Sequence, residues 1–268
     1  MSGSAVPLVI SRRRFGETSR RDFWWIQPIL VFAGLGTFIV YATWAAFQGD
    51  HYSYGPYLSP FYSPEIFGGP GSWFGPPPSV WPAVLPFSPA LLILPIPAFF
   101  RFTCYYYRGA YYKAFWGDPP SCTVGEHRKT YWGENSFPLI LQNVHRYMLF
   151  ISMLVLLILV LDAYRAFWFL DPATGRARFG IGAGSLVLAI NVTLLGGYLF
   201  GCHSMRHVVG GCVDELSRAP LGTRTYACVS CLNRRHMWWA WTSLFAVGFA
   251  DLYVRLCSMG VWSDLRIW

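Results

Sequence analysis

Residues 138–169 read PLILQNVHRYMLFISMLVLLILVLDAYRAFWF, and no charged side chain occurs from Met148 to Leu161. A helix needs about 20 mostly apolar residues to cross a bilayer, because each residue adds about 1.5 Å and the hydrocarbon core is about 30 Å thick. This stretch therefore predicts a transmembrane helix.

Four other segments have the same character, so the sequence predicts an all-α integral membrane protein with a bundle of about five helices. The helices are expected near residues 25–47, 82–102, 138–169, 179–202 and 237–257. Pro86, Pro89, Pro95 and Pro97 in the second segment predict a kink, because proline lacks the N–H of a helical hydrogen bond. Residues 48–81 are rich in Gly, Pro and aromatic residues and are expected to cap the helix ends. No repeat or second domain is visible, so residues 1–268 are predicted to form a single membrane domain.

The composition supports a membrane location. The chain is 54% hydrophobic and 13% charged, whereas soluble domains carry about 25% charged residues. A net charge of +8 would suggest nucleic acid as a partner of a soluble protein. In a membrane protein, basic residues set the topology and contact anionic lipid, so we expect lipid and no nucleic acid.

The basic residues predict the orientation. Sixteen Lys and Arg residues lie on the side of the N-terminus, and five lie on the opposite side. Cytoplasmic loops carry the excess of Lys and Arg. The N-terminus is therefore predicted to be cytoplasmic and the C-terminus to be outside.

Most cysteines and histidines gather on the predicted cytoplasmic side. They are Cys104, Cys122, Cys202, Cys212, Cys228 and Cys231 with His127, His145, His203, His207 and His236. The cytoplasm is reducing, so a metal or redox centre is a better expectation than disulfides. His203 and His207 are four residues apart, which places them on one helical face. The alternative is a pair of interfacial histidines bonded to lipid or loop carbonyls.

Two pairs of thiols could complete such a centre. Cys104 and Cys122 are favoured, because Cys122 lies in a loop with Pro and Gly that can aim a thiolate at the helix ends. Cys228 and Cys231 form a CxxC motif, but no Gly or Pro makes the turn of a metal knuckle, so that segment reads as the start of the fifth helix. Cys202, Cys228 and Cys231 are reserve candidates.

Three kinds of centre fit these residues. One is a redox-silent structural zinc. Another is a Rieske-type [2Fe–2S] cluster held by Cys104, Cys122, His203 and His207. A b-type haem clamped by His145 with His203 or His207 is the alternative. His145, Arg146 and Tyr147, at the entrance of the third helix, predict a polar pocket for a small redox molecule.

Four segments carry a resemblance to a known family. They are TCYYYRGAYYKAFWGDPPSC (103–122), ILQNVHRYMLF (140–150), GCHSMRHVVGG (201–211) and LNRRHMWWAWTSLF (232–245). Together they resemble the membrane anchor, a cytochrome b-like subunit, of the actinobacterial class of succinate dehydrogenase.

The resemblance implies the only membrane subunit of a respiratory complex II in the bacterial plasma membrane. A flavoprotein subunit would oxidise succinate, an iron–sulfur subunit would carry the electrons onward, and the anchor would deliver them to a membrane quinone. The anchor alone would have no activity, and the complex could form a higher oligomer.

The resemblance also implies roles for residues. The cluster would relay electrons, and His145, Arg146, Tyr147 and His236 would bind or protonate the quinone head group. The basic loops and the aromatic run Tyr105–Trp116 would dock the iron–sulfur subunit. Diheme anchors carry histidines on several helices, but the first two helices here have none, which favours the cluster over haem. The rival reading is a non-redox transporter or scaffold with structural zinc.

Overall fold

The computed structural model describes residues 13–69, 72–82, 84, 86–128, 137, 139–172, 174–211, 215 and 220–267. Three of its helical segments are long and apolar enough to span a membrane: α1 (Ile26–Gln48), the segment Ile140–Arg165 and α6 (Ala183–Phe200). A fourth span results if the bent pair Pro89–Phe102 and Tyr105–Trp116 counts as one. The predicted all-α membrane fold is confirmed. The count of five helices and the orientation stay predictions.

Two compact units divide the described residues. The first takes residues from Met1–Gly36 and Cys104–Leu141, and the second takes residues from Thr37–Thr103 and Gln142–Trp268. The helix α1 contributes residues to both. The prediction of a single membrane domain stays a prediction.

In the first unit, the segment before α1 runs along the loop that follows two short helices. These helices are α4 (Tyr105–Ala110) and the π-helix η1 (Tyr111–Trp116). The backbone N–H of Gly16 donates to the carbonyl of Gly125 at 2.9 Å, and the N–H of Gly125 donates to the carbonyl of Glu17 at 2.9 Å. A Cβ at Gly125 would lie 1.9 Å from the carbonyl oxygen of Arg14. This approach therefore requires glycine.

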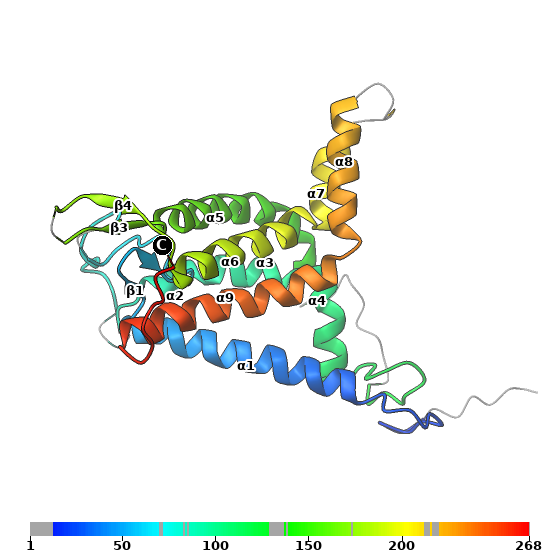
Figure 1. Ribbon diagram of the computed structural model, residues 1–268. Helices are drawn as coiled ribbons and strands as arrows, with labels where there is room; N and C mark the ends of the chain where they lie inside the picture. The colour runs from blue at the N-terminus through cyan, green and yellow to red at the C-terminus, as the bar shows by residue number, and fades with distance from the viewer. Residues whose placement is uncertain are drawn as a thin grey trace, which may run out of the picture. The chain divides into compact units, whose positions relative to one another are not determined.

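In the second unit, three long helices lie side by side (Figure 1): α5 (His145–Arg165), α6 and α9 (His236–Ser258). Small residues let α6 and α9 approach closely, as is usual in membrane bundles. A Cβ at Gly197 of α6 would lie 2.5 Å from the Trp239 ring of α9. We call the end of this bundle that carries His145 and His236 the inner end, because the sequence predicts that it faces the cytoplasm. The opposite end is the outer end.

The proline-rich segment forms a short, interrupted helix in the second unit. It consists of α2 (Pro89–Ile93) and α3 (Pro95–Phe102), with the break at Leu94. Fourteen residues reach about 21 Å at 1.5 Å per residue, less than the thickness of a bilayer core. The segment predicted near 82–102 therefore crosses only part of a membrane as helix.

The loop between α1 and α2 packs on the outer end of the bundle. It contains the hairpin β1 (Ser53–Tyr54) and β2 (Tyr57–Leu58), with Tyr54 paired to Tyr57. A second hairpin, β3 (Trp168–Leu170) and β4 (Ala177–Phe179), joins α5 to α6, with Phe169 paired to Arg178. Three carboxylates tie loops and helices together. Ser59 and Tyr41 donate to the buried Asp251, and Ser63 donates to the buried Asp162. Tyr57 and Tyr253 donate to Asp264, which is half-buried.

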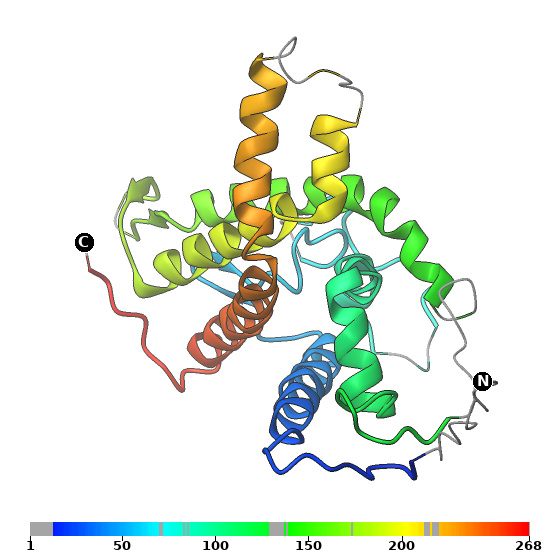
Figure 2. The ribbon, with the colours of Figure 1, turned by 90° about the vertical axis from the view of Figure 1, so that its right-hand side faces the viewer.

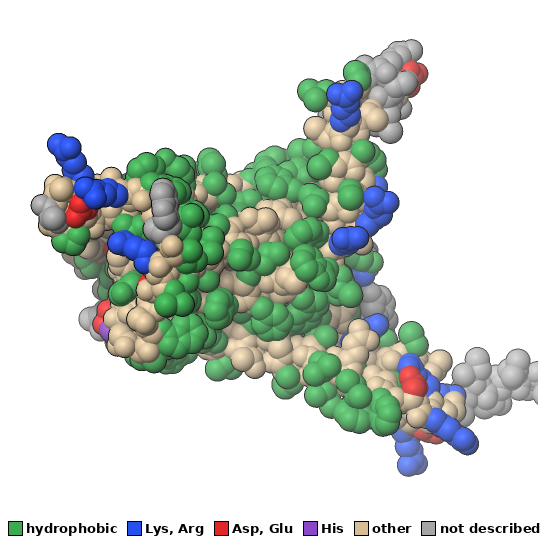
Figure 3. Space-filling model, viewed as in Figure 1, with side chains coloured by type: hydrophobic (Ala, Val, Ile, Leu, Met, Phe, Trp, Pro, Cys, Tyr) green, Lys and Arg blue, Asp and Glu red, His purple; other side chains and the backbone are tan. Residues whose placement is uncertain are grey.

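Two further helices leave the inner end of the bundle. They are α7 (His203–Gly210) and α8 (Pro220–Asn233), which lie beside each other (Figure 2). A short 3-10 helix, η2 (Leu139–Val144), precedes α5. Figure 3 shows hydrophobic side chains over the bundle, with Lys and Arg side chains on the β3–β4 hairpin and along α8. This distribution suits a bundle surrounded by lipid.

Candidate functional site

His145 is the first residue of α5 and is buried at the inner end of the bundle. Its Nδ1 atom lies 3.0 Å from Oγ1 of Thr103, and its Nε2 atom lies 3.1 Å from Sγ of Cys202. Its ring stacks on Phe100 with centroids 4.3 Å apart. The imidazole is therefore held on both edges and on one face.

His236, the first residue of α9, takes part in the same aromatic cluster. Its ring stacks on Tyr198 with centroids 5.1 Å apart. Tyr198 in turn meets Phe100 edge to face at 5.8 Å. Side chains from α3, α5, α6 and α9 thus form one continuous group of rings, from His145 through Phe100 and Tyr198 to His236.

Arg101 brings a positive charge to these rings. Its guanidinium carbon lies 4.4 Å from the centroid of the Tyr198 ring. Its N–H groups donate to the carbonyl of Ala240 at 3.1 Å and to Oγ of Ser243 at 2.8 Å. Ser243 follows His236 by two turns of α9, so the arginine lies about 10 Å inside the helix end. Ionisable groups at such a depth usually serve a function.

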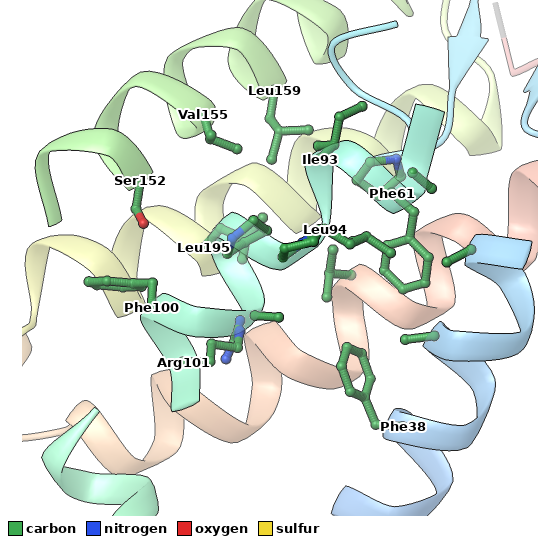
Figure 4. A pocket seen from close by; sticks show the side chains of 18 of the residues that line it. Phe38, Phe61, Ile93, Leu94, Phe100, Arg101, Ser152, Val155, Leu159 and Leu195 are labelled. Atoms are coloured by element: carbon green, nitrogen blue, oxygen red, sulfur yellow. The ribbon is translucent and has the colours of Figure 1, made fainter. Parts of the chain in front are cut away.

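A cavity of about 390 Å³ opens beside Arg101. Figure 4 shows Phe100, Arg101 and Ser152 at one end and Phe38 and Phe61 towards the other. The walls are otherwise almost entirely apolar. The Oγ atom of Ser152 is buried and has no hydrogen-bond partner among the described residues. The inner end of the cavity therefore offers a guanidinium and a hydroxyl within an apolar space.

Arg146 and Tyr147 do not join this group, although they follow His145 in the sequence. Both are exposed, and the Arg146 guanidinium carbon lies 5.4 Å from the centroid of the Tyr147 ring. Of the four residues predicted to contact quinone, the structure thus brings His145 and His236 into one cluster and places Arg146 and Tyr147 on the outside of α5.

His203 and His207 lie on one face of α7, with their Nε2 atoms 3.1 Å apart. Burial, followed by the neighbouring His207 and Arg206, lowers the pKa of His203. The predicted partner thiols belong to the first unit, where Cys104 is buried and Cys122 lies in an exposed loop. Cys228 and Cys231 are exposed on α8, and Cys212 lies outside the described residues.

The predicted metal centre is not supported. Within the described ranges, no group of three or more His, Cys, Asp and Glu side chains is arranged to hold a metal ion. A Rieske-type cluster on Cys104, Cys122, His203 and His207 needs four such ligands, as does a structural zinc. The haem alternative stays a prediction; in this structure the two ring nitrogens of His145 lie next to Thr103 and Cys202.

Comparison with known proteins shows the family. The family described as actinobacterial succinate dehydrogenase subunit SdhC matches residues 26–260. The chain belongs to the actinobacterial SdhC family. A chain in the solved structure of the Mycobacterium smegmatis Sdh1 complex in the apo form is 40% identical, with complete coverage of both chains and a TM-score of 0.83. No curated protein matches this chain.

Membership in the SdhC family makes the chain a subunit of succinate dehydrogenase, an oxidoreductase complex, and a multi-pass protein of the bacterial plasma membrane. The suspected resemblance is thereby confirmed. The rival reading of a non-redox transporter or scaffold is wrong.

The sequence analysis missed three residues of the cluster: Arg101, Ser152 and Tyr198. Arg101 had a visible signal, since it is the only charged residue in the apolar stretch Pro89–Phe102. In the prediction of the orientation, Arg101 is one of the sixteen basic residues on the side of the N-terminus. Ser152 and Tyr198 gave no comparable signal, because hydroxyl side chains are common in membrane helices.

Proposed function

We propose that this SdhC chain anchors the flavoprotein and iron–sulfur subunits of succinate dehydrogenase and delivers their electrons to a membrane quinone. In this proposal the quinone head group binds at the inner end of the cavity, beside Arg101, Ser152 and Tyr198. One observation carries the assignment: an apolar cavity in the bundle ends at the Arg101 guanidinium and at the buried Ser152 hydroxyl, which has no hydrogen-bond partner among the described residues.

The chemistry of quinone reduction suits these groups. A quinone accepts two electrons and two protons, and negative charge builds on its carbonyl oxygens as electrons arrive. The N–H groups of Arg101 and the O–H of Ser152 can donate hydrogen bonds to those oxygens. Donors fixed in an apolar site stabilise such charge more strongly than water does, because they need no reorientation.

The two buried histidines support this site from behind. His145 stacks on Phe100 and His236 stacks on Tyr198, and both of these aromatic residues line the cavity. We assign the histidines to positioning the rings and to exchanging protons between the cavity and the inner surface. The roles predicted for Arg146 and Tyr147 have less support, because both side chains are exposed.

The docking of the iron–sulfur subunit is assigned to the first unit, as the sequence predicts. Tyr105, Phe115 and Trp116 expose apolar rings there, and the guanidinium carbon of Arg108 lies 4.2 Å from the centroid of the Tyr105 ring. Exposed aromatic residues together with arginine are typical of protein interfaces. No step of the proposed electron transfer depends on a Rieske-type cluster, because the described residues contain no group of three or more side chains arranged to hold a metal ion.

The substitution Arg101→Gln tests the head-group site in the purified complex. We expect quinone reduction by succinate to fall by roughly tenfold or more, the usual effect of removing a charge-stabilising donor. Reduction of a soluble dye that takes electrons from the flavoprotein should stay at the wild-type rate, because the upstream subunits are intact.

Arg146→Gln is the matched comparison. If only Arg101→Gln slows quinone reduction, the head group is assigned to the cavity. If only Arg146→Gln slows quinone reduction, the head-group site lies on the exposed side of α5 and the proposal is overturned.

A further inference from the structure

The cavity continues well beyond the proposed head-group site. Its inner part is lined by Phe100, Arg101 and Ser152, and its outer part is lined by Ala42, Ala46 and Phe61. Residues of α1 from Phe38 to Phe47 take part in the wall, which corresponds to about 14 Å along that helix. The cavity is therefore elongated between the inner and outer thirds of the bundle.

The short proline-rich helix explains this space. Pro89 begins α2 and Leu94 separates it from α3, so neither helix extends along the full length of α5. Five residues from Leu91 to Pro97 line the cavity. The outer closure comes from the loop residues Pro60 and Phe61 rather than from a further turn of helix.

The chemistry of the two ends differs. Arg101, Ser152 and Tyr198 lie at the inner end, whereas Thr43 is the one residue with a polar side chain in the rest of the lining, which is otherwise formed by Ala, Val, Leu, Ile, Phe and Pro. An occupant must therefore have one small polar end and a long apolar part. A phospholipid does not meet this requirement, because its charged head would lie about 10 Å inside the helix ends.

We propose that the outer part of this cavity holds the part of the quinone's polyprenyl tail that is next to the head group. This part of the tail then runs from the head group at Arg101 and Ser152 towards the outer end, between α1, α3 and α5, instead of lying in the surrounding lipid. This inference rests on the proposed function and adds the substrate class: quinones with a long prenyl chain bind better than quinones without one.

The substitution Ala42→Phe tests the tail site. Its phenyl ring would fill the outer part of the cavity, whereas Arg101 and Ser152 lie at the inner end. Ala33→Phe is the control, since Ala33 is an exposed alanine of the same helix that does not line the cavity. The purified complex in lipid nanodiscs is assayed with a long-chain prenyl naphthoquinone and with the same ring lacking the tail. Ala42→Leu repeats the test with a smaller side chain.

The expected result is a rise of about tenfold or more in the ratio of the two KM values, long-chain over tail-less, because the tail loses its apolar contacts. Ala33→Phe should keep the wild-type ratio. A wild-type ratio in Ala42→Phe and Ala42→Leu would overturn the tail site. The proposed function would still stand in that case if Arg101→Gln slowed reduction of both quinones, and it would fall if Arg101→Gln slowed neither.

Mass spectrometry of lipids extracted from the same preparations identifies the occupant directly. We expect prenyl quinone to copurify with the wild-type complex and to be depleted in Ala42→Phe. Depletion of a phospholipid or fatty acid, with quinone unchanged, would overturn the proposal.

Discussion

Asn191 is a buried amide on α6 with 1% of its surface exposed. Neither its Oδ1 nor its Nδ2 atom has a hydrogen-bond partner among the described residues. It follows Ala183 by eight residues, so it lies about 12 Å from the outer end of α6. An unsatisfied buried amide costs about 1–3 kcal/mol, judged from mutational data.

Replacing this amide with an apolar group of similar size should remove that cost. We expect Asn191→Leu to raise the free energy of unfolding by about 1–3 kcal/mol, measured as the thermal stability of the detergent-solubilised complex. Thr193→Val is the control, because Thr193 is exposed and donates only to the carbonyl of Ala189 on its own helix. A loss of stability in Asn191→Leu would show that the amide has a polar partner, such as an internal water.

Individual residues of the site were only partly predictable from the sequence. His145 and His236 were predictable because histidines at the ends of apolar runs are rare and visible. Arg101 was visible as the lone charge of an apolar stretch, but its place in the site was not predictable, because its partners Ala240 and Ser243 are about 140 positions away in the sequence. No local pattern shows which helix will pack against such a side chain.

Among the helices, α6 and α9 make a close contact that depends on one of two adjacent glycines. A Cβ at Gly197 would lie 2.5 Å from the Trp239 ring, whereas a Cβ at Gly196 would meet no atom closer than 3.9 Å. Gly197→Ala should therefore destabilise the complex by about 1–3 kcal/mol through overpacking. Gly196→Ala should be neutral or stabilise it by up to about 1 kcal/mol, because alanine favours the helix. The melting temperatures of the two variants are compared in parallel. Equal changes in melting temperature would contradict the close contact between Gly197 and Trp239.

The long helices were predictable because apolar runs of about 20 residues have few alternatives in a membrane protein. The predicted boundaries 25–47 and 237–257 differ from α1 and α9 by one residue at each end.

The shorter helices α7 and α8 were harder to predict. The segment with Cys228 and Cys231 was expected to begin the fifth helix, but α8 ends at Asn233 and α9 starts separately at His236. Hydropathy does not show such a break when both sides are helical.

For the molecule as a whole, the distribution of Lys and Arg predicts which loops face the cytoplasm. Val84 is 90% exposed in the loop before α2, on the predicted outer side, and Cys228 is exposed on α8, on the predicted cytoplasmic side. We expect a membrane-impermeant maleimide to label Val84→Cys in intact cells and Cys228 only in inverted vesicles. Peptide mass spectrometry locates the label. Labelling of Cys228 in intact cells would show that the orientation is the opposite of the predicted one, with the end of the bundle that carries His145 and His236 facing outside.

The cavity depends on where two prolines interrupt a helix more than on the size of the side chains that line it. A single large side chain, as in Ala42→Phe, fills one part of the cavity, whereas the length of the space is kept as long as Pro89 and Pro95 keep the helix short. One point mutation would therefore be enough to exclude a compound that occupies the outer part. The same mutation would also take space from the quinone tail, so the resistant variant would lose part of its quinone turnover.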